Sequence, residues 1–488
     1  MERGGIGKDS LKLTVSQMGA LIIGLVSTML LSRFRTLGEY GTYSQMYLIA
    51  GILSPILMMG IPASLSYFLA RASDDSEKRE VLSQNLISVT VLGILTFSVI
   101  VLSRNFLESY FSNPMLGSMI VIIALFPWSR TISDTMQHIL VIYNKSAGFL
   151  FYKISHSLMI LAAVVIAVSM KLDFTIYMTI FISVETVYAV LVYIISARVS
   201  GGLKWYFSMP LMKKILAYSI PIGLSGAISS LNRHIDELVI GRFFSTEDLA
   251  VYVNSARELP LRLLGISIAT AMVPRFILMV KENNMKGAVM LWKESIKLSY
   301  VFMCFFSTVL IVYAPEIISI LYSAKYLPGV TVFRIYAIIM LMSVTHFYMV
   351  ISSLGKTKYI LYTTVGTILL NVVLSILFYR LLGFVGPAVA TLISFLVFRF
   401  SQLIISVKLS DIGFTEIMPW GTFGIIGIVN AGFGGLFALL REVVHLESSI
   451  GWIPESVLLG FFWMILYFGI YFKYIKNKWD ILNKGGED

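Results

Sequence analysis

Five polar or ionisable residues cluster within one hydrophobic helix of the segment 216–252: Asn232, Arg233, His234, Asp236 and Glu237. Charges at the depth of a membrane span are costly unless they are paired or hydrated, so residues of this kind usually serve a function there. Helical spacing would let Arg233 pair with Asp236 or Glu237 on one face. The pattern fits a structural ion pair near a helix end or a helix that lines a water-filled cavity. Four ionisable groups in so short a stretch favour the cavity.

The composition indicates a membrane protein that is helical throughout. The chain has 488 residues, of which 57% are hydrophobic and 13% charged, and its mean hydropathy is +0.83. Soluble folds cannot bury so much apolar surface, and the apolar runs are continuous rather than alternating, which argues against a β-barrel. The single cysteine, Cys304, can form no intramolecular disulfide. We therefore predict an all-α polytopic membrane protein.

About fourteen apolar segments are long enough to span a bilayer. The fourth is the least hydrophobic, and the second, eighth and tenth have indistinct ends. The first is expected to be a retained span rather than a cleaved signal peptide. The loops are too short for a soluble domain. The segments lie near residues 11–32, 42–69, 82–102, 116–142, 147–170, 174–197, 212–240, 249–277, 295–314, 328–354, 358–380, 384–407, 417–440 and 453–474.

Lysine and arginine are distributed unevenly over the connecting segments. If the N-terminus is cytoplasmic, the cytoplasmic segments hold 23 of these residues and the opposite segments hold 8. This bias predicts that the chain lies in the cytoplasmic membrane with both of its termini in the cytoplasm. It also accounts for the net charge of +11 as a topology signal beside anionic lipid, so no nucleic-acid partner is expected.

Further ionisable residues fall inside the predicted spans. Arg130, Asp134 and His138 follow one another at intervals of four, which places them along one helix face. One such residue is usually an interhelical hydrogen-bond partner. Several together, with basic residues in excess, predict a cationic cavity for an anion. The predicted substrate-binding residues are Arg130, Lys153, Arg233, Arg257, Arg262 and Arg334, and the further polar cavity residues are Asp134, His138, His156, Glu185 and His234.

Motifs of soluble enzymes are missing from the sequence. There is no Gly-x-x-x-x-Gly-Lys-Ser/Thr phosphate loop, so we do not expect ATP hydrolysis. The histidines lack the spacing of metal ligands, because His138 and His156 are the closest pair. The chain is therefore expected to be neither an enzyme nor a metalloprotein, and to need no cofactor.

An internal repeat links the two halves of the chain. RFRTLGEYGTYSQ begins at Arg33 and RFFSTEDLAVYVN begins at Arg242, and each follows an apolar span and precedes a span that contains proline. The offset matches six spans, which predicts two pseudo-symmetric bundles with the same topology. The expected lobes are residues 1–205 and 206–410, followed by two extra helices and a basic cytoplasmic tail in residues 411–488. Such a plan is typical of transporters that work by alternating access.

Three segments resemble a known family. SRFRTLGEYGTYSQ and MGIPASLSYFLAR are similar to its first-half signature, and IPIGLSGAISSLNRHIDELVIGRFFSTEDLAVYVNSAREL is similar to its second-half signature. Together they resemble the Wzx-type polysaccharide flippases of the multidrug/oligosaccharidyl-lipid/polysaccharide (MOP) exporter superfamily. Asp236 falls on the acidic position of the second-half signature. Leu249 and Ala250 stand where the family has glycine.

The resemblance implies a flippase that moves a polyprenyl-pyrophosphate-linked oligosaccharide from the cytoplasmic to the outer leaflet for polysaccharide biosynthesis. Membrane lipid would surround it, and a polysaccharide polymerase and glycosyltransferases would be its partners. Three alternatives stay open. They are a multidrug or metabolite cation antiporter of the same superfamily, a flippase for the peptidoglycan precursor lipid II, and a scaffold without transport activity in a polysaccharide synthase complex.

The source of energy is the last question that the sequence raises. Without a nucleotide motif, uphill transport needs an ion gradient, the membrane potential or consumption of the product. An acid beside an arginine can exchange partners when it is protonated or binds Na⁺. Asp236 and Glu237 are therefore predicted to bind a coupling H⁺ or Na⁺. The alternative is that they neutralise Arg233 permanently.

Overall fold

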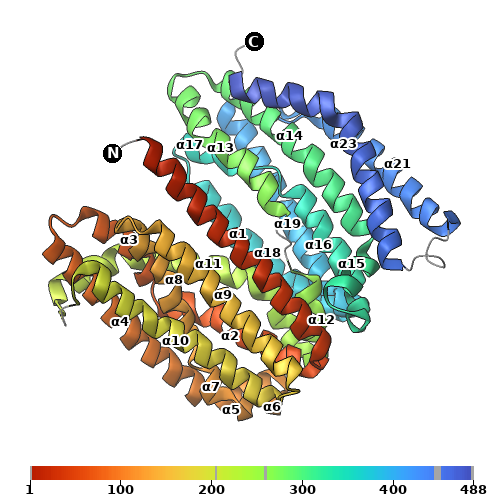
Figure 1. Ribbon diagram of the computed structural model, residues 1–488. Coiled ribbons are helices and arrows are strands. Elements are labelled where there is room, and N and C mark those ends of the chain that lie inside the picture. Colours follow the sequence, from red (N-terminus) through yellow and green to blue (C-terminus); the bar gives the residue numbers. More distant parts are fainter. Residues whose placement is uncertain (1–2, 204–205, 258–260, 445–451, 485–488) are drawn as a thin grey trace. The chain divides into compact units, whose positions relative to one another are not determined.

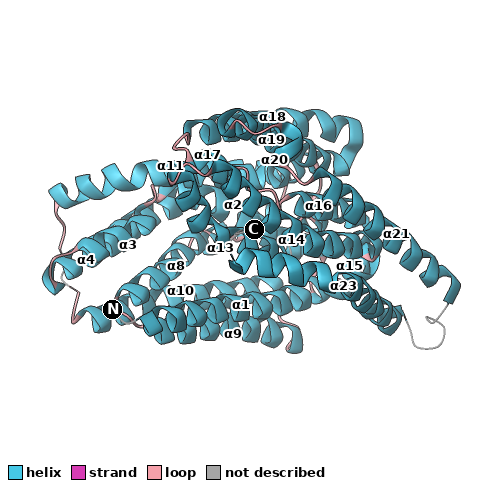
Figure 2. Ribbon diagram, turned by 90° about the horizontal axis from the view of Figure 1, so that it is seen from above, coloured by secondary structure: helices cyan, strands magenta, loops and turns pink. Residues whose placement is uncertain are grey.

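The computed structural model describes residues 3–203, 206–257, 261–444 and 452–484, and this part of the chain is helical with no strand. Figure 2 shows helices joined by short loops. The all-α fold is confirmed. By packing, the chain divides into a first unit, Met1–Ala250, and a second unit, Val251–Asp488. The lobes 1–205 and 206–410 inferred from the repeat stay a prediction.

The first unit contains the helices coloured from red through yellow to light green in Figure 1. Helix α9 packs against both α1 and α10, and α11 packs against α2 and α3. The boundary between the units falls inside α12. The helices are α1 (Arg3–Phe34), α2 (Leu37–Leu57), α3 (Ile61–Arg71), α4 (Asp75–Leu102), α5 (Arg104–Phe111), α6 (Pro114–Ser118), α7 (Ile120–Ile123), α8 (Phe126–Ile142), α9 (Ser146–Ser169), α10 (Phe174–Ser200), α11 (Met209–Phe243) and α12 (Thr246–Ser255).

The second unit is built around α14, which packs against α13, α16, α21 and α23. Helices α18 and α19 form a hairpin. The elements are α13 (Arg262–Lys281), α14 (Met285–Val312), α15 (Ala314–Leu321), the 3₁₀ helix η1 (Ala324–Gly329), α16 (Val330–Met342), α17 (Tyr348–Ser353), α18 (Lys358–Leu382), the 3₁₀ helix η2 (Gly383–Val385), α19 (Gly386–Ser410), α20 (Phe414–Ile417), α21 (Trp420–Val444) and α23 (Trp452–Lys484).

Fewer helices than the fourteen expected spans are long and apolar enough to cross a membrane. Within the described residues there are ten such segments, or eleven if the bent pair α2 and α3 counts as one span. One of the ten, Lys358–Ser410, contains both α18 and α19. The difference lies in spans that the chain breaks. The expected span 116–142 falls on α6, α7 and α8, and 249–277 falls on α12 and α13.

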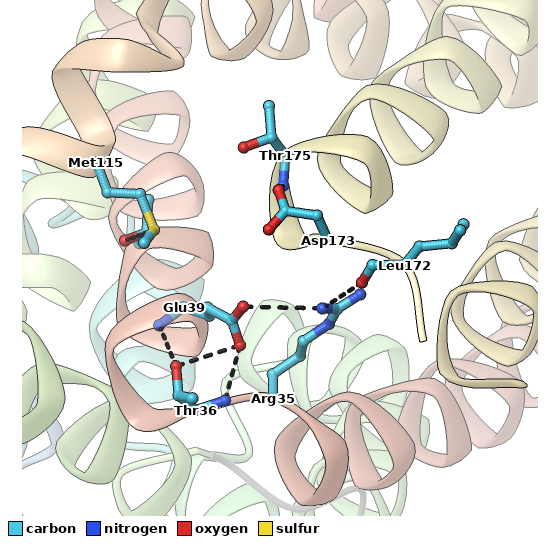
Figure 3. A network of polar contacts seen from close by, with 8 residues as sticks. Arg35, Thr36, Glu39, Met115, Leu172, Asp173 and Thr175 are labelled. Carbon is cyan, nitrogen blue, oxygen red and sulfur yellow. Dashed lines mark hydrogen bonds and ion pairs between the residues drawn. The ribbon is translucent and has the colours of Figure 1, made fainter. Parts of the chain in front are cut away.

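The two copies of the repeat begin with the same local structure. At the start of α2, the Thr36 amide donates to Glu39 at 2.8 Å and the Glu39 amide donates to the Thr36 hydroxyl at 3.2 Å (Figure 3). At the start of α12, the Ser245 amide donates to Asp248 at 3.2 Å and the Asp248 amide donates to the Ser245 hydroxyl at 3.0 Å. Both are capping boxes, in which side chains satisfy backbone amides that a helix start leaves open. The repeat seen in the sequence is therefore present in the backbone.

Arg35 fastens the first of these turns to another part of the first unit. Its guanidinium donates to the Leu172 carbonyl at 2.9 Å and lies 3.8 Å from Glu39, as Figure 3 shows. The same guanidinium lies 5.3 Å from the ring centre of Tyr177 on α10. The corner between α1 and α2 is thus held against the connection between α9 and α10.

Candidate functional site

The first unit contains an open cavity of about 560 Å³ between α2, α3, α8 and α11. All four helices include residues from the apolar segments expected to span the membrane. The predicted site residues Arg130, Asp134, Arg233 and His234 line it. The remaining lining residues are Tyr47, Ala50, Gly51, Ser54, Pro55, Met58, Gly60, Pro62, Ala63, Phe126, Thr131, Ile222, Gly223, Gly226 and Ser230.

A break between α2 and α3 forms part of the lining of this cavity. Pro55 lies inside α2 and Pro62 lies at the start of α3, and the two helices are bent by 50°. Proline removes a backbone donor and clashes with the preceding turn, so it weakens a helix at that point. Met59 and Gly60 both have positive φ angles, 48° and 70°, in the connection. The sequence MMGIP therefore turns the chain in the middle of the expected second span.

Close contact with α11 fixes the bent pair in place. A Cβ atom at Gly60 would lie 2.5 Å from the backbone nitrogen of Gly223, and one at Gly223 would lie 2.4 Å from the carbonyl carbon of Met59. The Ser230 hydroxyl donates to the Gly51 carbonyl at 2.6 Å. Small residues let two backbones approach closely within a membrane, where burial of apolar surface does not drive helices together. These contacts set the position of the charged residues farther along α11.

The charged side chains at the cavity carry a positive balance. Arg130, Asp134 and Arg233 are all exposed rather than buried, and no ion pair of either arginine occurs among the described residues. The Arg130 guanidinium lies 5.2 Å from the ring centre of Tyr47 and 5.8 Å from that of Phe126. Two arginines against one aspartate can attract an anion, and guanidinium groups suit phosphate oxygens because they donate two parallel hydrogen bonds.

The structure corrects the expected pairing on α11. Glu237 binds His234, with 2.8 Å between its Oε2 and the imidazole Nδ1, and not Arg233. Gly51 explains this choice, because a Cβ atom there would lie 2.6 Å from His234 Nε2, so α2 holds the ring against α11. Asp236 is buried, with 3% of its surface exposed, and does not line the cavity. Arg233 is thus left to face the cavity.

Four other predicted residues of the first unit lie outside the cavity lining. Lys153 is half-buried on α9. His138 Nδ1 is 2.8 Å from the Ser66 hydroxyl. The last two of these residues lie together, with 3.3 Å between His156 Nε2 and Glu185 Oε2. Whether they bind substrate stays a prediction.

The remaining basic residues belong to the second unit. Arg257 is exposed just after α12. Arg334 is exposed on α16 and donates from Nε to the Ile311 carbonyl at 3.0 Å. The side chain of Arg262 lies outside the described part of the chain. Their part in substrate binding also stays a prediction.

Several lining residues were not predicted from the sequence. Gly223, Gly226 and Ser230 follow one another at spacings of three and four, which places these small residues on one face of α11. That pattern could have identified the face that packs against α2 and α3. No comparable sequence pattern identifies Tyr47, because its contact with Arg130 depends on how α2 packs against α8.

Comparison with solved structures shows the fold. The lipid II flippase MurJ in its inward closed conformation is 16% identical, with a TM-score of 0.74, and the match covers 95% of this chain and 99% of that one. An inward-facing multidrug resistance MATE family transporter of the MOP superfamily is 15% identical, with a TM-score of 0.65 and coverage of 83% and 99%. A MOP superfamily transporter from Pyrococcus furiosus, described as having a binding pocket of reversed polarity, is 15% identical, with a TM-score of 0.55 and coverage of 83% and 96%.

The chain thus has the fold of these flippases and transporters, and its long apolar helices are those of a multi-pass membrane protein. No match was found among curated protein sequences. The model of a protein family described as polysaccharide biosynthesis protein matches residues 6–280, and the chain belongs to this family.

Proposed function

We propose that this protein is a flippase that moves a polyprenyl-pyrophosphate-linked oligosaccharide from the cytoplasmic to the outer leaflet of the cell membrane by alternating access, with both of its termini in the cytoplasm. The observation that carries the proposal is the cavity with Arg130 and Arg233 inside apolar helices. A pyrophosphate cannot cross about 30 Å of hydrocarbon unaided, whereas a guanidinium-lined cavity offsets its negative charge. Membership of a polysaccharide biosynthesis family supports the glycan part.

A flippase for lipid II is the second candidate, since its substrate also joins a sugar to a prenyl chain through pyrophosphate. The likeness to MurJ, which extends over 95% of this chain, favours it as an alternative. An organic cation fits less well, because the cavity holds more basic than acidic groups. A scaffold without transport activity would need no such cavity.

A reconstituted flipping assay tests the proposal. The full-length protein is placed in liposomes with a labelled lipid-linked oligosaccharide, with lipid II, or with a fluorescent organic cation. We expect movement of the lipid-linked oligosaccharide, and loss of that movement in Arg130→Gln. Movement of lipid II alone would assign the second candidate, and movement of the cation alone would overturn the anion cavity. No movement of any substrate would favour the scaffold, with polysaccharide polymerase and glycosyltransferases as its partners.

Coupling to an H⁺ or Na⁺ gradient through Asp236 and Glu237 is part of the proposal. The same assay is run with and without each gradient on the wild type and on Asp236→Asn. We expect the variant to lose ion dependence while it still binds substrate. Unchanged ion dependence would leave Asp236 with a structural role.

A further inference from the structure

A buried acid and base lie against each other inside the first unit, away from the lining of the cavity. The imidazole Nε2 of His156 on α9 is 3.3 Å from Oε2 of Glu185 on α10. Their side chains are 13% and 6% exposed. Glu185 lies near the middle of α10, so it is at a depth where an ionised carboxylate is costly.

The Glu185 carboxylate is paired with a histidine, whereas a permanent ion pair usually has a lysine or an arginine. No lysine or arginine lies within ion-pair distance of Glu185 among the described residues. The imidazole is instead framed by aromatic rings, since its centre is 4.6 Å from that of Tyr188, and the Tyr152 hydroxyl donates to the Tyr188 carbonyl at 3.1 Å. An arginine keeps its charge at all physiological pH values, whereas an imidazole gains or loses a proton near neutrality.

Few other titratable groups share this region. Helix α1, which packs against α9, has no charged residue between Lys12 and Arg33. Helix α4, which packs against α10, has none between Glu80 and its end at Leu102, and α7 has none. The other titratable groups on α8, α9 and α10 are Arg130, Asp134 and His138 of α8, Tyr152 and Lys153 of α9, and Tyr177, Tyr188, Tyr193 and Arg198 of α10.

The pair is connected electrostatically to the cavity. Glu185 and Asp134 both attract the Arg130 guanidinium, which lines the cavity wall. A proton added to the pair makes it more positive by one charge, whether it neutralises Glu185 or charges His156. In either case less negative charge opposes Arg130, and the cavity becomes more attractive to an anion.

We propose that His156 and Glu185 form a proton-binding site within the first unit, and that its protonation raises the affinity of the neighbouring cavity for a phosphate-bearing anion. The proton site stands on the geometry of the pair alone. Its effect on affinity rests on the proposed function of the cavity. The two parts are therefore tested separately.

The first experiment counts protons on the full-length protein in nanodiscs without ligand. Between about pH 5.5 and 8.5, where imidazole changes its charge, the wild type should take up about one proton more than the double variant His156→Gln/Glu185→Gln. Equal uptake would show a permanent ion pair and overturn the proposal. If the double variant does not fold, Glu185→Gln alone serves, because it has to shift the titration of His156, and an unshifted titration would overturn the proposal in the same way.

The second experiment measures the binding of inorganic pyrophosphate by calorimetry over the same pH range. The affinity of the wild type for pyrophosphate should rise by about fivefold or more as the pH falls. A fivefold change is the lower end of the usual range for two coupled binding sites. Glu185→Gln should bind more tightly at high pH, and His156→Gln more weakly at low pH. His346→Gln, which removes a buried histidine of the second unit, should keep the wild-type dependence.

The outcomes separate the two proposals. Proton uptake by the pair without pyrophosphate binding at any pH would overturn the anion cavity and leave the proton site intact. Binding that is independent of pH in the wild type would overturn the link between the pair and the cavity, even where the pair takes up its proton.

Discussion

Helices α1 and α11 hold equivalent places in the repeat, yet they differ in the residues that could do chemistry. Each ends just before a capping box, Thr36 with Glu39 and Ser245 with Asp248. At the repeat offset, however, Arg233 of α11 corresponds to Gly24 of α1. The neighbouring ionisable residues His234, Asp236 and Glu237 likewise correspond to Leu25, Ser27 and Thr28.

Their packing differs as well. Helix α1 packs against α9, whereas α11 packs against α2 and α3. A Cβ atom at Gly24 would meet nothing within 4 Å, while one at Gly223 would collide with backbone, and Thr14 stands at the α1 position that corresponds to Gly223. The turn is thus common to both copies, but Arg233, one of the two arginines of the cavity, is found only in the second. The two helices therefore provide matched sites for mutation.

The largest effect is expected from giving α11 the residue found in α1. Arg233→Gly should lower the transport rate by about ten- to a hundredfold, because a hydrogen bond to a charged group contributes about 1.5–3 kcal/mol. Flipping by reconstituted protein measures this effect, with Arg198→Gln at the exposed end of α10 as the control. Equal rates for the two variants would remove Arg233 from the site.

Replacing a glycine by alanine should have different effects on stability in α11 and in α1. Gly223→Ala should lower the free energy of unfolding by about 1–3 kcal/mol, the usual cost of overpacking, because its Cβ would lie 2.4 Å from a backbone carbon. Gly24→Ala should be neutral or slightly stabilising, since alanine is the better helix former. Thermal unfolding in detergent compares them. A similar loss in both variants would contradict the difference in packing.

The capping boxes should behave alike, in contrast with the helices that precede them. Thr36→Ala and Ser245→Ala each remove the side chain that accepts from a backbone amide at a helix start. Each should lower the free energy of unfolding by about 1 kcal/mol. The same unfolding measurement applies, and a marked inequality would mean that the two turns are not equivalent in energy.

The smallest effect on stability is expected from the removal of an exposed charge. The pKa of Asp173, at the start of α10, is lowered chiefly by the hydrogen bond from the Thr175 amide. A lowered pKa means that the ionised form stabilises the fold above the pKa of the unfolded chain and that this contribution is lost as the pH falls through the folded pKa. Asp173→Asn should therefore be slightly less stable than the wild type at neutral pH, and the difference should vanish on acidification. A difference that persists in acid would point to a cause other than charge.

The sequence predicted the helical membrane fold, the repeat and the polar role of α11, because hydropathy and charge are read directly from residue types. It misassigned the partner of Glu237, since spacing on one helix allows both Arg233 and His234. The choice depends on Gly51, which lies on another helix. The broken spans escaped prediction for a related reason. Pro55 and Gly60 signal a weak point, but the contact with Gly223 is what fixes the bend, and a single sequence does not show which helices meet.

The packing of α11 against α2 and α3 has a consequence for how the protein is made. While α1 to α10 are being synthesised, the face that carries Gly51 and Gly60 has no helix to cover it, because Gly223 and Ser230 come later in the chain. At roughly 5–20 residues per second, the ribosome needs several seconds to deliver the stretch from the end of α10 to the end of α11. During that interval the nascent first unit lacks the helix that completes the lining of its cavity. A chain that stops at residue 205 would remain in this state, whereas one that stops at residue 250 would carry that helix.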